Sequence, residues 1–173
     1  MIRLTLGALA AALIITPTPP FTESHSADMV GPPWISIEHP VNPYDATTRD
    51  AFLLVHAFHH GTAMNFPVTG TAEGIVDGKR QTEKLAFNRT SRTGVYALSR
   101  QWQQKGEWTL VISVAQGPED KVTAVVDLAS GGGMVAAVRV PTRQQGSYKI
   151  PAAVAMNEIE AALQARVKER SAP

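Results

Sequence analysis

Three of the five histidines and a methionine lie within nine residues of one another, in the segment HAFHHGTAM from His56 to Met64. Imidazole nitrogens and a thioether sulfur are ligands for copper, and the thioether favours Cu(I). On a strand, His56 and His60 would share one face while His59 points to the other; on a helix, His56 would face together with His59 or His60. The candidate metal ligands are therefore His56, His59, His60 and Met64. The alternative that we favour is that these residues belong to a strand and the loop that leaves it.

Catalytic motifs are absent from the sequence. It contains no Gly-x-Ser-x-Gly elbow, no His-Glu-x-x-His zinc motif and no phosphate loop. The glycine run at 131–136 matches a dinucleotide fingerprint formally, but a β-branched segment follows it where a helix would be needed. Acidic residues that folding could bring together are scattered, namely Glu73, Asp77, Glu83 and Asp127. The sequence thus predicts a noncatalytic protein, with a small hydrolase of unidentified site as an alternative.

Composition narrows the class of protein further. Sixteen basic and fifteen acidic residues give a net charge of +1, and basic residues cluster only near the C-terminus, so nucleic acid is not an expected partner. The chain of 173 residues has no cysteine, which excludes disulfides, thiol catalysis, cysteine-ligated metals and a lipoprotein anchor. Apart from copper at the histidine group, no cofactor is predicted. The length predicts one domain with extensions.

The N-terminus has the layout of a signal peptide. Arg3 precedes an apolar run from Leu4 to Ile15, and prolines follow from Pro17. The run is shorter than the roughly 20 residues that span a bilayer. We expect a signal peptide over 1–26, a linker over 27–33, a periplasmic or secreted location, and no membrane span after cleavage. Cleavage after Ser24 would leave His25 first, where its amine and ring could chelate copper.

Short apolar segments separated by turn residues predict an antiparallel β domain between residues 34 and 115. Asp77-Gly78 is typical of a two-residue hairpin turn. Alternation from Trp108 onward predicts that Trp108, Leu110 and Ile112 face the core. The segment 51–58 could also form a helix, but its shortness and its neighbours favour a strand. The predicted strands lie near 34–39, 51–58, 71–76, 82–87, 94–100 and 107–114.

The character of the sequence changes after residue 115. Two strands are predicted at 122–128 and 134–140, about the glycine turn at 130–133, and a helix is predicted over 151–168. We therefore expect a hairpin extension over 116–150 and a C-terminal helical segment over 151–173. The apolar stripe of the helix is modest, which suits packing on the domain or contact with another protein.

One stretch resembles a known family. Gly94, Tyr96, Trp102, Gly106 and Trp108 occupy the positions of a Gly-x-Tyr strand, a short loop and a Gly-x-Trp strand, as in the YtkA-like and FixH-like exported proteins. The resemblance covers about residues 34–115 and implies an all-β, immunoglobulin-like antiparallel sandwich, here with a C-terminal hairpin and terminal α-helix. In such a fold the tyrosine hydroxyl bonds to the backbone and Trp108 fills the core.

The same resemblance bears on function. Some members of that family are associated with copper handling or oxidase assembly, which implies an exported binding or accessory module. It also implies a partner that is another exported or membrane protein, and leaves a periplasmic copper-binding protein as the first alternative.

Overall fold

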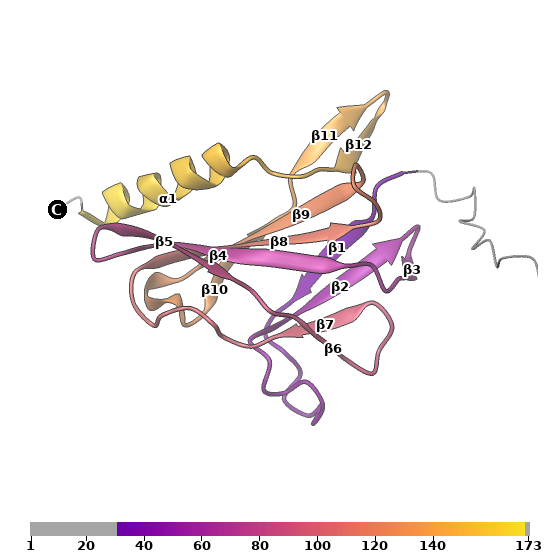
Figure 1. Cartoon of the computed structure of the whole chain (residues 1–173), viewed down its shortest axis with the longest axis horizontal. Helices are drawn as coiled ribbons and strands as arrows, with labels where there is room; N and C mark the ends of the chain where they lie inside the picture. Colours follow the sequence, from indigo (N-terminus) through magenta and orange to yellow (C-terminus); the bar gives the residue numbers. More distant parts are fainter. Residues whose placement is uncertain (1–30, 172–173) are drawn as a thin grey trace, which may run out of the picture.

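The computed structural model describes residues 31–171. The predicted signal peptide, His25 and most of the predicted linker lie outside this range. The described chain folds into antiparallel β-sheets with one C-terminal helix (Figure 1). The general prediction of a mostly β protein that ends in a helix is therefore confirmed.

The first sheet has five strands in the order β1-β2-β7-β6, with β3 also paired to β2. All the pairs in this sheet are antiparallel. Its strands are β1 (Trp34–Glu38), β2 (Leu53–His59), β3 (Thr62–Ala63), β6 (Asn88–Arg89) and β7 (Val95–Leu98).

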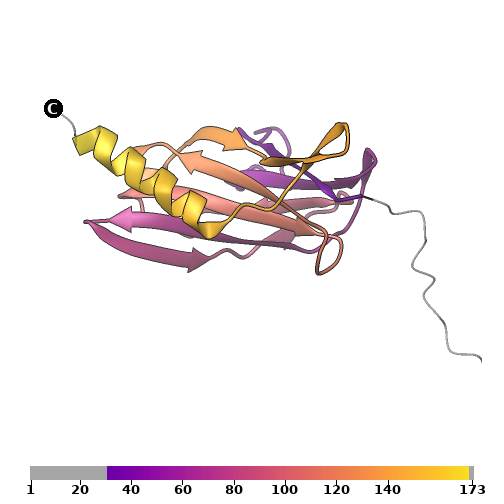
Figure 2. The ribbon, with the colours of Figure 1, turned by 90° about the horizontal axis from the view of Figure 1, so that it is seen from above.

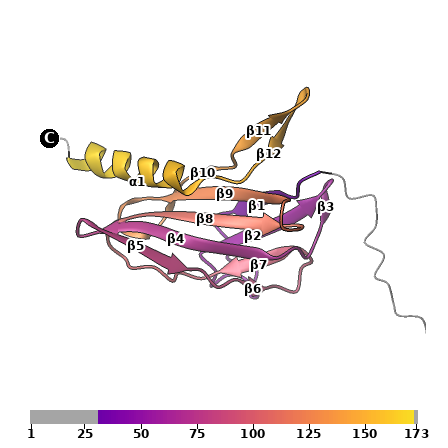
Figure 3. The same cartoon turned by 45° about the horizontal axis from the view of Figure 1, so that its top comes forward.

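The second sheet also has five antiparallel strands, in the order β10-β9-β8-β4-β5. Its strands are β4 (Val68–Val76), β5 (Lys79–Lys84), β8 (Glu107–Ala115), β9 (Lys121–Leu128) and β10 (Val135–Arg139). A separate two-stranded hairpin, β11 (Thr142–Gln145) and β12 (Tyr148–Pro151), projects from the body (Figures 1 and 3).

One apolar core lies between the two sheets. Leu53, Val55 and Ala57 of β2 belong to the same buried cluster as Trp108 and Leu110 of β8. These residues alternate along their strands, because successive side chains of a strand point to opposite faces. The prediction that the series beginning at Trp108 faces the core is confirmed.

Buried aromatic side chains satisfy their polar atoms with backbone carbonyls. The Tyr96 hydroxyl donates to the carbonyl of Phe66 at 2.6 Å, and Trp102 Nε1 donates to the carbonyl of Gly132 at 3.0 Å. Gly74 lies against the ring of Trp108, where an added Cβ would come within 2.4 Å of a ring carbon. The backbone partner predicted for Tyr96 is therefore present, and Trp108 is closely packed.

The structure differs from the sequence prediction in several bounds. Segment 51–58 is a strand, as favoured, but β5 begins at Lys79 because the Asp77-Gly78 turn leads directly into pairing with Val76. The strands β3, β6, β11 and β12 were not predicted. Helix α1 (Met156–Ser171) starts later than residue 151, because Pro151 pairs with Thr142 in the hairpin.

The segment 116–150 does not form a separate extension throughout. Strand β9 pairs along its whole length with β8, and its Val122, Ala124 and Val126 lie in the main core. Strand β10 continues the same sheet. Only β11 and β12 stand apart from it, so the sheet predicted to close at residue 115 includes two further strands.

Helix α1 lies on the outer face of the second sheet and runs obliquely over its strands (Figures 2 and 3). Ile159 and Leu163 pack there against Ile75, Val111 and Val125. The sheet is therefore covered on both sides along part of its length. Within residues 31–171, no helix is long and apolar enough to cross a membrane.

Candidate functional site

The histidine group is divided between the two sides of β2. His56 points away from the core, where its Nε2 lies 2.8 Å from a carboxylate oxygen of Glu38 and its ring stacks on Phe58. His59 points inward, is 6% exposed, and lies edge-on to Phe66. Strand alternation thus separates His56 from His59, as the strand interpretation of the sequence required.

A tight turn places the other two candidate ligands. His60 and Gly61 both have positive φ, of 47° and 79°, and reverse the chain from β2 into β3. The rings of His59 and His60 have centroids 4.2 Å apart, while Met64 packs against the core. His59 Nε2 is buried with no hydrogen-bond partner among the described residues. The part of the chain that the structure describes contains no group of three or more His, Cys, Asp or Glu side chains that could hold a metal.

Two carboxylates on the outer face of the second sheet are buried under or beside helix α1. Glu73 accepts hydrogen bonds from Arg80 and Thr82, both at 2.7 Å, and Arg80 also bonds to Glu160 of the helix. Burial alone would raise the pKa of Glu73, but these hydrogen bonds, another from Thr71 and the charge of Arg80 together lower it. Glu73 is therefore held ionised and paired.

The second carboxylate, Glu107, pairs with an arginine of the helix. Arg166 lies 2.9 Å from Glu107 and 3.5 Å from Asp127, and it donates to Thr109 as well. Asp77 pairs with Lys105 at the edge of the sheet. The ion pairs of Arg80 with Glu160 and of Arg166 with Glu107 and Asp127 join α1 to the sheet.

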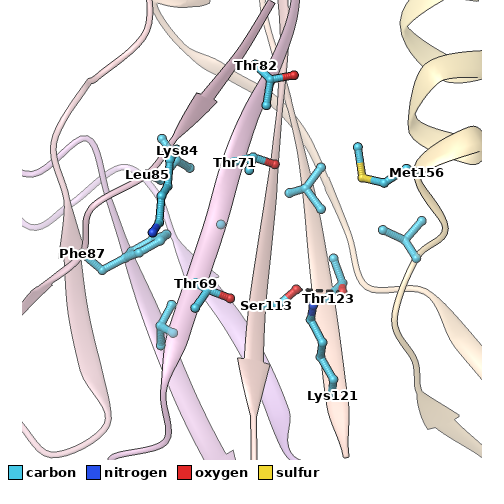
Figure 4. Close-up of a pocket in the computed structure, with 14 residues that line it drawn as sticks. Thr69, Thr71, Thr82, Lys84, Leu85, Phe87, Ser113, Lys121, Thr123 and Met156 are labelled. Atoms are coloured by element: carbon cyan, nitrogen blue, oxygen red, sulfur yellow. Dashed lines mark hydrogen bonds between the residues drawn. The ribbon is translucent and has the colours of Figure 1, made fainter. Parts of the chain in front are cut away.

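The outer face of the second sheet is open beside the start of α1. A groove of about 670 Å³ lies there, between the edge strand β5 and the segment that leads into the helix (Figure 4). Strands β4, β8 and β9 form its floor. Its lining residues are Val68, Thr69, Gly70, Thr71, Thr82, Lys84, Leu85, Phe87, Val111, Ser113, Lys121, Thr123, Val154 and Met156.

The floor of the groove carries hydroxyl groups. Ser113 and Thr123 are a cross-strand pair whose oxygens lie 3.1 Å apart, and Thr69 stands opposite Ser113 on the next strand (Figure 4). Ser113 and Thr123 are only 5% and 2% exposed. Each hydroxyl can both donate and accept hydrogen bonds, so this row can match a ligand that carries groups of the same kind.

The walls of the groove differ from its floor. Leu85 and Phe87 lie on one side, and Val154 and Met156 on the other. Met156 is 50% exposed. Apolar walls with a few polar groups between them are typical of small-molecule sites.

Sequence reasoning missed the groove because it considered only the residues of β8 that face the core and assigned no role to those between them. Thr109, Val111 and Ser113 do face outward, but α1 and its leading segment cover part of that face. The hydroxyls become one row only when the register of β4, β8 and β9 is known. The signal in the sequence was weak, since β9 contributes Thr123 alone and Val111 interrupts the outward series of β8.

No family model, curated protein or solved structure matched this chain.

Proposed function

We propose that this protein is an exported, noncatalytic binding module that holds a hydroxyl-rich ligand in the groove on the second sheet. The observation that carries the proposal is the row of Thr69, Ser113 and Thr123 hydroxyls between apolar walls. The groove lining contains no histidine or carboxylate. This composition favours binding over hydrolysis, because histidine and carboxylates are the side chains that hydrolases use most for acid–base catalysis.

The proposal includes the finer fold and the location. Two antiparallel sheets about one core support an immunoglobulin-like sandwich, and the Gly94, Tyr96 and Trp108 pattern supports membership of the YtkA-like and FixH-like family. Export is supported by the residues from Arg3 to Pro17. Mass spectrometry of the purified protein should find a new N-terminus between Ser24 and Asp28; an intact Met1 would contradict export by cleavage.

The absence of cysteine makes a direct test of the groove simple, because one introduced cysteine is then unique. An environment-sensitive dye is attached to an Ala155→Cys variant, at an exposed position between Val154 and Met156 that leaves the floor hydroxyls intact. Neutral and acidic mono- and oligosaccharides are then added. We expect a saturable change in emission with at least one of them. The same dye on Thr142→Cys, on the projecting hairpin, should not respond.

A second variant removes the floor hydroxyls with little effect on the fold. Ser113→Ala combined with Thr123→Val replaces both partners of one hydrogen bond, which is close to neutral for stability. In the dye-labelled background this change should weaken the response. If no compound alters the dye at Ala155→Cys, or if both dye positions respond alike, the groove is not the binding site.

A further inference from the structure

The charge of the groove is entirely positive. Lys84 and Lys121 are the two charged residues among those that line it, and no acidic residue accompanies them. Among the described residues, the one ion pair that involves a lysine is that of Lys105 with Asp77. Both groove lysines are exposed and have no acidic partner to neutralise them. The groove therefore favours a ligand with negative charge.

The two lysines stand at opposite corners of the floor. Lys84 is opposite Thr71 on β4, and through it Val111 on β8, whereas Lys121 is opposite Ala115 on β8. Three strand spacings across the sheet and four residues along it, at about 4.8 Å and 3.4 Å each, separate their Cα atoms by about 20 Å. In Figure 4 the Lys84 amine is directed toward Phe87 and the Lys121 amine toward the Ser113–Thr123 pair.

The separation of the two amines limits how one small anion can contact both. Five bonds of about 1.5 Å allow a lysine stem to reach at most about 6.5 Å from its Cα atom, so the amines stay about 7 Å or more apart. A carboxylate oxygen contacts an ammonium at about 2.8 Å, and the two oxygens of one carboxylate lie about 2.2 Å apart, so one carboxylate spans at most about 7.8 Å between two ammonium nitrogens. One small anion therefore reaches both amines only when both stems extend fully toward each other, whereas the Lys84 amine is directed toward Phe87 (Figure 4). A ligand with two or more anionic groups spaced along its length engages both lysines without that constraint.

We propose that the ligand is an acidic oligosaccharide, with carboxylate groups that pair with Lys84 and Lys121 and ring hydroxyls that bond to Thr69, Ser113 and Thr123. This rests on the proposed function. A sugar chain suits the floor because its hydroxyls, like those of the protein, both donate and accept. Its apolar ring faces suit the walls at Phe87 and Met156.

Calorimetric titration of the purified protein tests this ligand class. The probes are tetragalacturonate and tetramannuronate, with fully methyl-esterified tetragalacturonate as the neutral match, galacturonate as the monomer, and tetraglutamate as an acidic peptide. We expect one of the two acidic tetrasaccharides to bind most tightly, and its affinity to fall as salt is raised. A lost exposed charge pair corresponds to a loss of affinity of up to about fivefold. The monomer, which can form only one of the two pairs, should therefore bind more weakly than the tetrasaccharide, and the neutral ester, which can form neither, should lose up to the factor for two pairs.

Variants of the two groove lysines test whether each contacts the ligand. Lys84→Gln and Lys121→Gln should each lower the affinity for the acidic tetrasaccharide by about two- to fivefold. Lys79→Gln, on the same strand as Lys84 but outside the groove, should not change it.

Each of the following results would overturn the assignment of an acidic oligosaccharide. If the ester binds as tightly as the acidic tetrasaccharide, charge is not recognised. If the monomer binds as tightly, chain length is not recognised. If tetraglutamate binds more tightly, the groove is a site for acidic peptides. If neither tetrasaccharide binds while the dye at Ala155→Cys responds to another compound, this inference fails and the proposed function stands. If the dye also responds to nothing, both fail.

Discussion

The guanidinium of Arg166, on helix α1, lies 2.9 Å from the carboxylate of Glu107, a residue of β8 that is 5% exposed. The same guanidinium donates to the carbonyls of Trp108 and Leu128. One side chain therefore joins the helix to two neighbouring strands.

Replacing Arg166 with methionine should destabilise the protein. Removal of one partner from a buried ion pair leaves the other charge uncompensated, at a cost of about 3 to 5 kcal/mol. We expect about 3 kcal/mol, since 22% of the Arg166 side chain is exposed. Urea unfolding measures the loss, with Lys168→Met on the same helix as the control. A loss within about 0.5 kcal/mol of the control would show that the pair does not hold the helix.

The acid stability of the protein should depend on Glu73. Its pKa is lowered in the folded state despite burial, because Thr71, Thr82 and Arg80 hydrogen-bond to the ionised form. The unfolded chain therefore binds a proton more readily than the folded one. This contribution to stability is fully present above about pH 4.3, the ordinary glutamate pKa, and is lost as pH falls through the lowered folded pKa.

A Glu73→Gln variant removes that dependence. We expect it to be less stable than the parent at neutral pH, with a smaller further loss between about pH 4.3 and pH 2. Unfolding by urea at a series of pH values measures both effects. Glu83→Gln, an exposed change on β5, is the control. If the free energy of unfolding falls with pH in the same way for the Glu73 variant and the parent, Glu73 is not the source of the acid dependence.

Truncating Trp108 to alanine should cost about 3 to 5 kcal/mol. The side chain is fully buried, packs against Gly74, and donates from Nε1 to the carbonyl of Lys105 at 2.7 Å. Thermal unfolding followed by calorimetry measures the loss. An unchanged melting temperature would mean that the tryptophan does not fill the core as described.

Several features of the fold were predictable from sequence because strand alternation is a local signal. The series from Trp108 to Val114 and the Asp77-Gly78 turn lie where their patterns indicated. The place of β9 in the main sheet was not predictable, since it depends on pairing with β8 and not on its own composition. The groove depends on three strands in register, so no single segment of sequence indicates it. The histidine group was conspicuous in sequence, yet the sheet separates its members.

That separation gives a prediction for copper. His56 lies on the outer side of β2 and His59 on the inner side, so one ion cannot bind both without disruption of the strand. Titration with Cu(II), and with Cu(I) under reducing conditions, should show the same behaviour for the parent and for a His56→Ala, His60→Ala double variant. His39→Ala, outside the group, is the control. A stoichiometric site that disappears in the double variant alone would restore the histidine group as a copper site.

The most direct test of the binding groove is to map bound ligand on the ¹⁵N-labelled protein by NMR. Neutral and acidic mono- and oligosaccharides are titrated, and backbone amide shifts are followed across the chain. The predicted result is a saturable set of shifts at Thr69, Ser113 and Thr123 and along the segment from Val154 to Met156. A second, smaller pocket is lined by Trp34, Phe58, His60 and Gly61. Shifts confined to that pocket, or no saturable shifts at all, would contradict the assignment of the groove as the binding site.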